Sequence, residues 1–428
     1  MSSPWASRFS YLDVSVNGPR ASVTVQLDDL TFTETLVSDE GLNLEPARPL
    51  VELWGLLAGL SYYKAGAAPI IDVGDIPLGD AGRALLEAAV RDGLGEYAYR
   101  NGLDLSGVEI IGGGDVEASS MPLDPQRALV PFGGGIDSVA TWHHLSPQLD
   151  TSFFVVSPAS GRYAALENAM AETGTPVRRL TRTLDPQITT PQPHWLNGHV
   201  PVTAMITVAA AAVALADGRG SVILSNEHSA SVPNIVVNGR GVNHQWSKSA
   251  EAEVLLANAI SERVSAPLTV ASFLRAKSEP WVARDIASDA NLLRVVRSCN
   301  RAFRQDVESR AVTWCGECDK CLFVNLMLAP FVERSELRQI FDGTEPLTHA
   351  PLRSSLETLL GLIDGPKPFE CVGDVTECRA ALTAVVTHPD WRDDSDLADL
   401  AQRAPATVGI DELMNDQGDD RVPATWRR

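Results

Sequence analysis

The middle of the chain alternates between short apolar runs and helical stretches, and this pattern most limits the folds open to it. Five runs are predicted strands: residues 128–132, 152–156, 177–180, 221–224 and 267–270. Each ends in small or polar residues, as strands of a parallel sheet in α/β proteins commonly do. We therefore predict an α/β fold with a parallel sheet core, in which ligands bind beyond the carboxyl ends of the strands.

Changes of pattern along the chain predict three units. Residues 1–125 combine a β-hairpin or meander with two amphipathic helices, which indicates an N-terminal α+β unit. Residues 126–330 hold the parallel core, and residues 331–428 form a helical C-terminal extension. A chain of 428 residues is long enough for two or three packed units.

The first core strand runs into a glycine-rich loop and then a predicted helix. Backbone N–H groups of such a loop can donate hydrogen bonds to an anion, and the helix N-terminus adds partial positive charge. Pyrophosphate is therefore the expected ligand. Asp137 could hold Mg²⁺, although a glycine turn capped by an Asp would show the same residues. The predicted nucleotide-binding residues are Phe132, Gly133, Gly134, Gly135, Asp137, Ser138 and Ser157.

Four cysteines have the spacing of metal ligands. Cys299 precedes a Cys-Gly-Glu-Cys-Asp-Lys-Cys run that contains Cys315, Cys318 and Cys321, and four thiolates can close a tetrahedral site. Zinc in a structural role is our first choice, while an iron–sulfur cluster or unligated core cysteines remain open. Six cysteines in so long a chain indicate a reducing compartment, so we expect a cytoplasmic protein.

Candidate acids, bases and substrate contacts lie in polar stretches. Glu227 and His228 follow a predicted strand and should face the ligand crevice. Glu370 and Cys371 lie in an aromatic and glycine setting that favours shifted pKa values. The other candidates are Lys277 for catalysis, and His244, Lys248 and Arg284 for substrate binding. Surface loops, solvated helix faces or a small buried cysteine would explain the same residues.

Charge and hydropathy limit the partners. The formal net charge of −20 disfavours binding of extended nucleic acid. The longest apolar run, residues 204–216, is shorter than the roughly 20 residues of a membrane span. We therefore expect small phosphorylated ligands, no membrane and no extended nucleic acid; the oligomeric state stays open.

The glycine-rich loop resembles the Ser-Gly-Gly-x-Asp-Ser loop of the PP-loop ATP pyrophosphatases, with Gly133 where that family usually has serine. The Ser298-Cys299 pair and the Cys315-Gly-Glu-Cys318 motif also resemble one branch of these enzymes, the 7-cyano-7-deazaguanine synthases. This resemblance covers residues 128–323, about half the chain. It implies an ATP-binding catalytic domain with a four-cysteine site.

Further stretches resemble the bacterial UDP-N-acetylmuramoyl-L-alanyl-L-glutamate epimerases: 131–138, 243–248, 314–318 and 368–373. This resemblance implies an isomerase of peptidoglycan precursor synthesis, and so of cell-wall biogenesis, cell shape and cell division. The implied reaction uses ATP and Mg²⁺ to invert the terminal L-Glu of UDP-MurNAc-L-Ala-L-Glu to D-Glu through an acyl-adenylate. AMP and pyrophosphate would be released.

Two other functions stay open. A ligase-like PP-loop enzyme, making an amide, nitrile or thiolated product, would need ammonia or a sulfur donor. A nonenzymatic nucleotide-binding protein would release no pyrophosphate with any acceptor.

Overall fold

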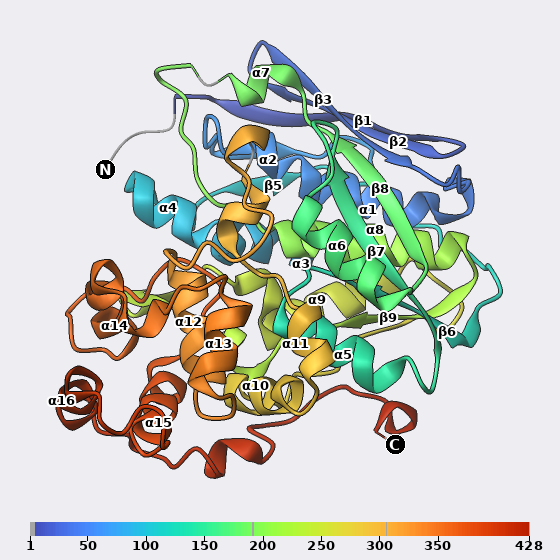
Figure 1. Cartoon of the computed structure of the whole chain (residues 1–428). Coiled ribbons are helices and arrows are strands. Elements are labelled where there is room, and N and C mark those ends of the chain that lie inside the picture. The colour runs from blue at the N-terminus through green and yellow to red at the C-terminus, as the bar shows by residue number, and fades with distance from the viewer. Residues whose placement is uncertain (1–4, 191, 305, 428) are drawn as a thin grey trace.

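The computed structural model of the chain describes residues 5–190, 192–304 and 306–427. Its centre is a ten-stranded sheet with the strand order β12-β9-β6-β7-β8-β3-β2-β1-β4-β5 (Figure 1). The strands are β1 (Arg8–Asn17), β2 (Arg20–Leu27), β3 (Leu30–Ser38), β4 (Ile70–Asp72), β5 (Glu109–Ile111), β6 (Asp124–Pro131), β7 (Asp150–Pro158), β8 (Val177–Thr183), β9 (Arg219–Leu224) and β12 (Thr269–Ser272). A separate hairpin pairs β10 (Ile235–Val237) with β11 (Arg240–Val242).

Parallel pairs dominate this sheet. The run from β12 to β8 is parallel throughout, as are the pairs β1–β4 and β4–β5, whereas β8–β3, β3–β2 and β2–β1 are antiparallel. All five predicted core strands are present as β6, β7, β8, β9 and β12. The prediction of an α/β fold with a mostly parallel sheet is confirmed.

The N-terminal strands extend the same sheet. Strand β3 pairs with β8 in the register Ser38↔Leu180, and Figure 1 shows the blue strands β1–β3 beside β8. The side chain of Glu34 is fully buried there and accepts hydrogen bonds of 2.6 and 2.9 Å from Arg182. The first two predicted units therefore share one sheet, and their division into separately folding units stays a prediction.

Successive side chains of the core strands enter different hydrophobic cores, because side chains of a strand alternate between the two sheet faces. In β6, Leu129 joins the core of one face and Val130 that of the other. Helices α1 (Arg48–Ala58), α3 (Asp80–Ala88), α8 (Val202–Ala216) and α9 (Ala250–Ser261) contribute to the first core. Helices α5 (Ile136–Leu145), α6 (Ala164–Thr173), α10 (Glu279–Ala287) and α12 (Asp319–Leu328) contribute to the second.

The C-terminal region is helical, as predicted, and packs on the second core. It contains α13 (Arg334–Ile340), α14 (Arg353–Leu359), α15 (Val375–Val385) and α16 (Ser395–Arg403), drawn in orange and red in Figure 1. The remaining helices are α2 (Leu60–Tyr63), α4 (Gly95–Asn101), α7 (Pro186–Thr189) and α11 (Ala290–Val295). Among the described residues, no helix is both long and apolar enough to cross a membrane.

Candidate active site

The glycine-rich loop lies at the carboxyl end of β6, where it leads into α5. Gly134 has φ +71°, and a Cβ there would lie 2.9 Å from the carbonyl oxygen of Arg297. Both facts require glycine at this position. Gly135 is the N-cap of α5, and its carbonyl accepts a 3.1 Å hydrogen bond from the Ser138 hydroxyl. A Cβ on Gly133 would meet no described atom within 4 Å, so this position has room for a side chain.

Three carboxylates meet beside this loop. Asp137 comes from α5, Glu227 from the turn after β9, and Glu279 from the first turn of α10; one oxygen of each lies within 4.8 Å of the others. Glu227 and Glu279 are only 3% and 2% exposed. Asp137 Oδ1 and Glu279 Oε2 are buried without a hydrogen-bond partner among the described residues. Buried oxygens in this arrangement suit a divalent cation.

The charge of this carboxylate group is only partly balanced by the protein. Burial, followed by the charge of Glu227, raises the pKa of Asp137 to about 7. Burial and the charge of Asp137 likewise raise the pKa of Glu279. The ammonium groups of Lys248 and Lys320 oppose the shift at Asp137. A bound cation would take the place of the protons that these pKa values favour.

Cys371 lies between the same two lysines. Lys248 Nζ donates to Cys371 Sγ at 3.2 Å, and Lys320 Nζ donates to the Cys371 carbonyl at 2.6 Å. Burial acts to raise the pKa of Cys371, but the charge of Lys248 and a hydrogen bond with His244 outweigh it and lower the pKa to about 6. Cys371 is therefore a thiolate at neutral pH, the form in which a thiol acts as a base or nucleophile.

His244 completes the surroundings of the thiolate. Its Nδ1 contacts Glu96 Oε2 of α4. The centroid of its ring lies 4.2 Å from that of the His199 ring. Burial opposes a charge on His244, yet the hydrogen bonds to Cys371 and Glu96 raise its pKa to about 9. Burial, with the charge of His244, lowers the pKa of His199 to about 4. The two adjacent imidazoles therefore differ in charge at neutral pH.

Polar contacts hold the segment that carries Cys371. Asn234 accepts a 2.8 Å hydrogen bond from the His244 backbone and donates a 2.7 Å bond to the Pro368 carbonyl, which ties the two segments together. Glu370 Oε2 is buried without a partner among the described residues. Burial and the charge of Asp319 raise the pKa of Glu370 to about 7. Glu370 can therefore hold or release a proton near neutral pH.

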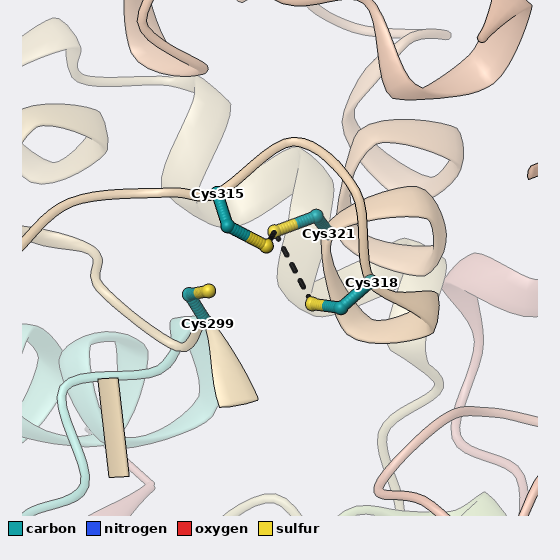
Figure 2. A group of neighbouring side chains, drawn as sticks. All are labelled: Cys299, Cys315, Cys318 and Cys321. Carbon is teal, nitrogen blue, oxygen red and sulfur yellow. Dashed lines mark hydrogen bonds between the residues drawn. The ribbon is translucent and has the colours of Figure 1, made fainter. Parts of the chain in front are cut away.

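The four predicted cysteine ligands converge. Figure 2 shows their thiols pointing toward one another, and the Sγ atoms all lie within 4.8 Å of each other. Cys321 Sγ is 3.7 Å from Cys315 Sγ and 3.5 Å from Cys318 Sγ. A Zn–S bond of about 2.3 Å gives sulfur separations of roughly 3.8 Å in a tetrahedron, so the geometry fits zinc.

The turn of the cysteine motif also depends on a glycine. Gly316 has φ +69°, and a Cβ there would lie 2.2 Å from Thr344 Oγ1. The segment 297–299 links the cysteine site to the glycine-rich loop, because the Arg297 backbone N–H donates to the Gly134 carbonyl. The cysteine site is therefore placed to hold the loop in position.

Four other predicted residues have contacts of their own. The Ser157 hydroxyl is buried against the guanidinium of Arg179. Lys277 pairs with Asp416 and lies 5.0 Å from the ring of Trp281, while Arg284 is exposed on α10. The His228 ring lies beside Gly418 in the C-terminal tail. The predicted roles of Ser157, His228, Lys277 and Arg284 stay predictions.

Four residues near Cys371 or the carboxylates were absent from the sequence-based candidates. Glu279 stands in the first turn of a helix, where an acid is usually explained by the helix dipole. Lys320 lies inside the cysteine motif. Because that motif was interpreted only as a metal site, its contact with Cys371 was not predicted. Glu96 and His199 lie outside any motif, so only the tertiary structure brings them to His244.

Comparisons with known proteins give a consistent result across the chain. A family profile described as the MurL N-terminal domain matches residues 5–273, and one described as the MurL C-terminal domain matches residues 295–414. A UDP-N-acetyl-alpha-D-muramoyl-L-alanyl-L-glutamate epimerase of Salinispora tropica is 38% identical over 364 residues, which are 84% of this chain and 78% of the relative.

Proteins of the same name from two other bacteria are similar over most of their length. The one from a Micromonospora species is 40% identical over 390 residues, covering 89% of this chain and 85% of the relative. The one from Xanthomonas oryzae pv. oryzae is 36% identical over 400 residues, covering 91% and 87%.

Proposed function

The chain belongs to the MurL family of epimerases, and on this premise we propose that it inverts the terminal L-Glu of UDP-MurNAc-L-Ala-L-Glu to D-Glu. One observation carries the proposal: the Cys371 thiolate accepts a hydrogen bond from Lys248 near a glycine-rich loop and a group of three carboxylates. A base next to a nucleotide site is what an activated epimerisation needs. A nucleotide-linked precursor and ATP would place this isomerase in the cytoplasm, in peptidoglycan synthesis.

We propose that the loop at residues 133–135 and the first turn of α5 bind the phosphates of ATP in a PP-loop arrangement. A strand end, a required glycine and a helix N-terminus support this. A carboxylate poorly stabilises a carbanion beside it, so the substrate carboxylate would first attack the α-phosphorus of ATP. Pyrophosphate leaves, and the resulting acyl-adenylate makes the α-hydrogen more acidic.

Asp137, Glu227 and Glu279 would hold the Mg²⁺ that accompanies ATP. Asp137 and Glu279 each have a buried oxygen without a hydrogen-bond partner among the described residues, which supports this assignment. The bound ion would neutralise negative charge on the phosphates. Lys248 contributes a further positive charge: burial opposes its ionisation, but the charges of Cys371, Glu227 and Asp137 raise its pKa. Lys248 therefore links the carboxylates with the thiolate electrostatically.

Cys371 would remove the α-proton. The Cα–H bond breaks, an S–H bond forms, and the electron pair moves toward the acyl carbonyl of the adenylate. A proton then returns to the opposite face of Cα, and Glu370 is suited to supply it because its pKa is raised to about 7. Water finally hydrolyses the adenylate, which releases AMP and the D-Glu product.

We assign the four-cysteine site a structural zinc. All four positions of a tetrahedron would be filled by thiolates, which leaves no open position for substrate. The site also resembles that of the ligase-like PP-loop enzymes, so a reaction that consumes ammonia is the second candidate function. Product formation that depends on ammonia would favour it.

The test uses the purified chain with ATP, Mg²⁺ and UDP-MurNAc-L-Ala-L-Glu in deuterated water. AMP, pyrophosphate, the chirality of the Glu residue and deuterium at its α-carbon are measured together. Substrate-dependent AMP with α-deuterated D-Glu would support the proposal. Unchanged L-Glu with no AMP would reject it.

Two variants test the proton-transfer step. Cys371→Ala and Glu370→Gln each should reduce α-deuterium incorporation while leaving formation of the adenylate measurable. If both variants kept full deuterium incorporation and full epimer yield, neither residue would move the α-proton.

A further inference from the structure

We propose that Glu96, on α4 of the N-terminal segment, is a positioning residue that orients His244 and keeps it protonated beside the Cys371 thiolate. The inference rests on the proposed function, because it assigns a role within the same site. It also gives the first 125 residues a part in the chemistry that no sequence motif indicates.

The contacts form a chain from Glu96 through His244 to Cys371. Glu96 Oε2 contacts Nδ1 of His244, and His244 in turn interacts with the Cys371 thiol. Glu96 is only 5% exposed, so its carboxylate meets the imidazole with little competition from water. A carboxylate on one ring nitrogen fixes the orientation of the ring and stabilises its protonated form. In this order a carboxylate orients an imidazole, and the imidazole activates a thiol. Activated nucleophiles and bases in enzymes commonly have this arrangement.

Helix α4 also contacts the segment that carries Cys371. Arg100 Nε donates to Glu96 Oε1 at 2.6 Å, which leaves Oε2 for His244. The guanidinium of Arg100 lies 4.8 Å from the ring centroid of Phe369, and the Tyr99 ring lies 5.8 Å from it. One helix therefore contacts both the His244 side chain and the segment that carries Cys371.

His244 supplies a positive charge that the lysines do not replace. Lys248 is shared between Cys371 and the carboxylates Glu227 and Asp137. Lys320 donates to the backbone carbonyl of Cys371 rather than to its sulfur. Without Glu96, only Cys371 would oppose the effect of burial, which lowers the pKa of His244 as it does that of the adjacent His199. The thiolate would then keep less positive charge beside it at the same pH.

The charged groups that act on Cys371 and His244 come from several elements. A pH profile reports the combined effect of all these groups on the two pKa values. Those around Cys371 are Lys248, His244, Lys320, Asp137 and Glu370. Those around His244 are Cys371, Glu96, Glu370 and His199.

The test compares Glu96→Gln with a matched control, Glu34→Gln. Glu34 is another buried carboxylate of the N-terminal segment, but it pairs with Arg182 and lies in β3. The pH dependence of kcat/KM and that of Cys371 alkylation by iodoacetamide are measured for each protein, with peptide mass spectrometry to identify the labelled cysteine. Alkylation reports the thiolate fraction whether or not the enzyme turns over.

For Glu96→Gln we expect the acid limb of kcat/KM, where Cys371 ionises, to move up by about one pH unit, because losing a neighbouring opposite charge shifts a pKa by about one to three units. The midpoint of Cys371 alkylation should rise by about one unit, because His244 then loses its charge at lower pH. Glu34→Gln should lower the thermal midpoint without moving either pH midpoint. If Glu96→Gln does not fold, Glu96→Asp keeps the charge but withdraws it by one methylene, and should shift both midpoints in the same directions by less.

The outcomes separate the inference from the proposed function. If Glu96→Gln shifts the alkylation midpoint but the wild-type chain shows no epimerisation, the Glu96 role stands and the proposed function fails. If the wild type epimerises and Glu96→Gln leaves both midpoints in place, as Glu34→Gln does, the inference is overturned.

Discussion

Replacing Gly134 by alanine should damage ATP binding far more than the same change at Gly133. Gly134 has φ +71°, and a non-glycine residue in the left-handed region costs about 1–2 kcal/mol. The new Cβ would also lie 2.9 Å from the Arg297 carbonyl, which belongs to the backbone and cannot rotate away. An energy of 1–2 kcal/mol corresponds to a factor of about 5–30 in an equilibrium constant. We therefore expect the KM for ATP to rise by about 5- to 30-fold.

The assay is pyrophosphate release as a function of ATP concentration, with the thermal midpoint measured in parallel. Gly133→Ala is the matched control, because a Cβ at Gly133 meets no described atom within 4 Å. Gly133→Ser goes further, since it restores the hydroxyl that the PP-loop pattern has at this position. It should leave the KM for ATP unchanged or lower it.

Equal KM values for Gly134→Ala and Gly133→Ala would refute the reasoning. No pyrophosphate release from the wild type at any ATP concentration would instead refute the assignment of the loop to ATP.

The remaining predictions concern the metal sites and the pH profile. Cys299→Ser should lower both the zinc content and the thermal midpoint, because zinc bound by four thiolates stabilises the folded state. An unchanged thermal midpoint in metal-free wild-type protein would contradict this. The kcat/KM of the wild type should rise with pH through about 6, as the Cys371 thiol ionises, and fall above about 7, as Glu370 loses the proton that it supplies. A single limb near the ordinary thiol pKa would contradict this. Glu279→Gln should raise the Mg²⁺ concentration needed for half-maximal activity by about tenfold, which corresponds to a loss of roughly 1.4 kcal/mol in the free energy of cation binding. An unchanged Mg²⁺ titration would contradict the carboxylate site.

The elements predicted best were those whose signal lies in consecutive residues. The five core strands and the glycine-rich loop were found because each apolar run, and the glycines that follow it, are contiguous in the chain. The convergence of the four cysteines was predicted for a related reason, since three of them share one short turn. In such cases the local sequence nearly determines the local geometry.

The composition of the active site was harder to predict. Cys371 and Lys248 were selected separately, without any indication that their Nζ and Sγ atoms lie 3.2 Å apart. Glu279 and Glu96 were not selected, because a single acid on a helix carries no sign of what it faces. Burial decides the pKa of such a group, and burial depends on segments far away in the sequence.

The sequence by itself determined the α/β architecture of the core, the loop after β6 and the set of four thiols. It did so because strand periodicity, left-handed glycines and metal-ligand spacing are local properties. Only the tertiary structure decided that β3 joins β8, which extends the core sheet into the N-terminal segment. It alone brought Glu96 of α4 to His244 and Cys371, because side chains separated by hundreds of residues meet only through packing.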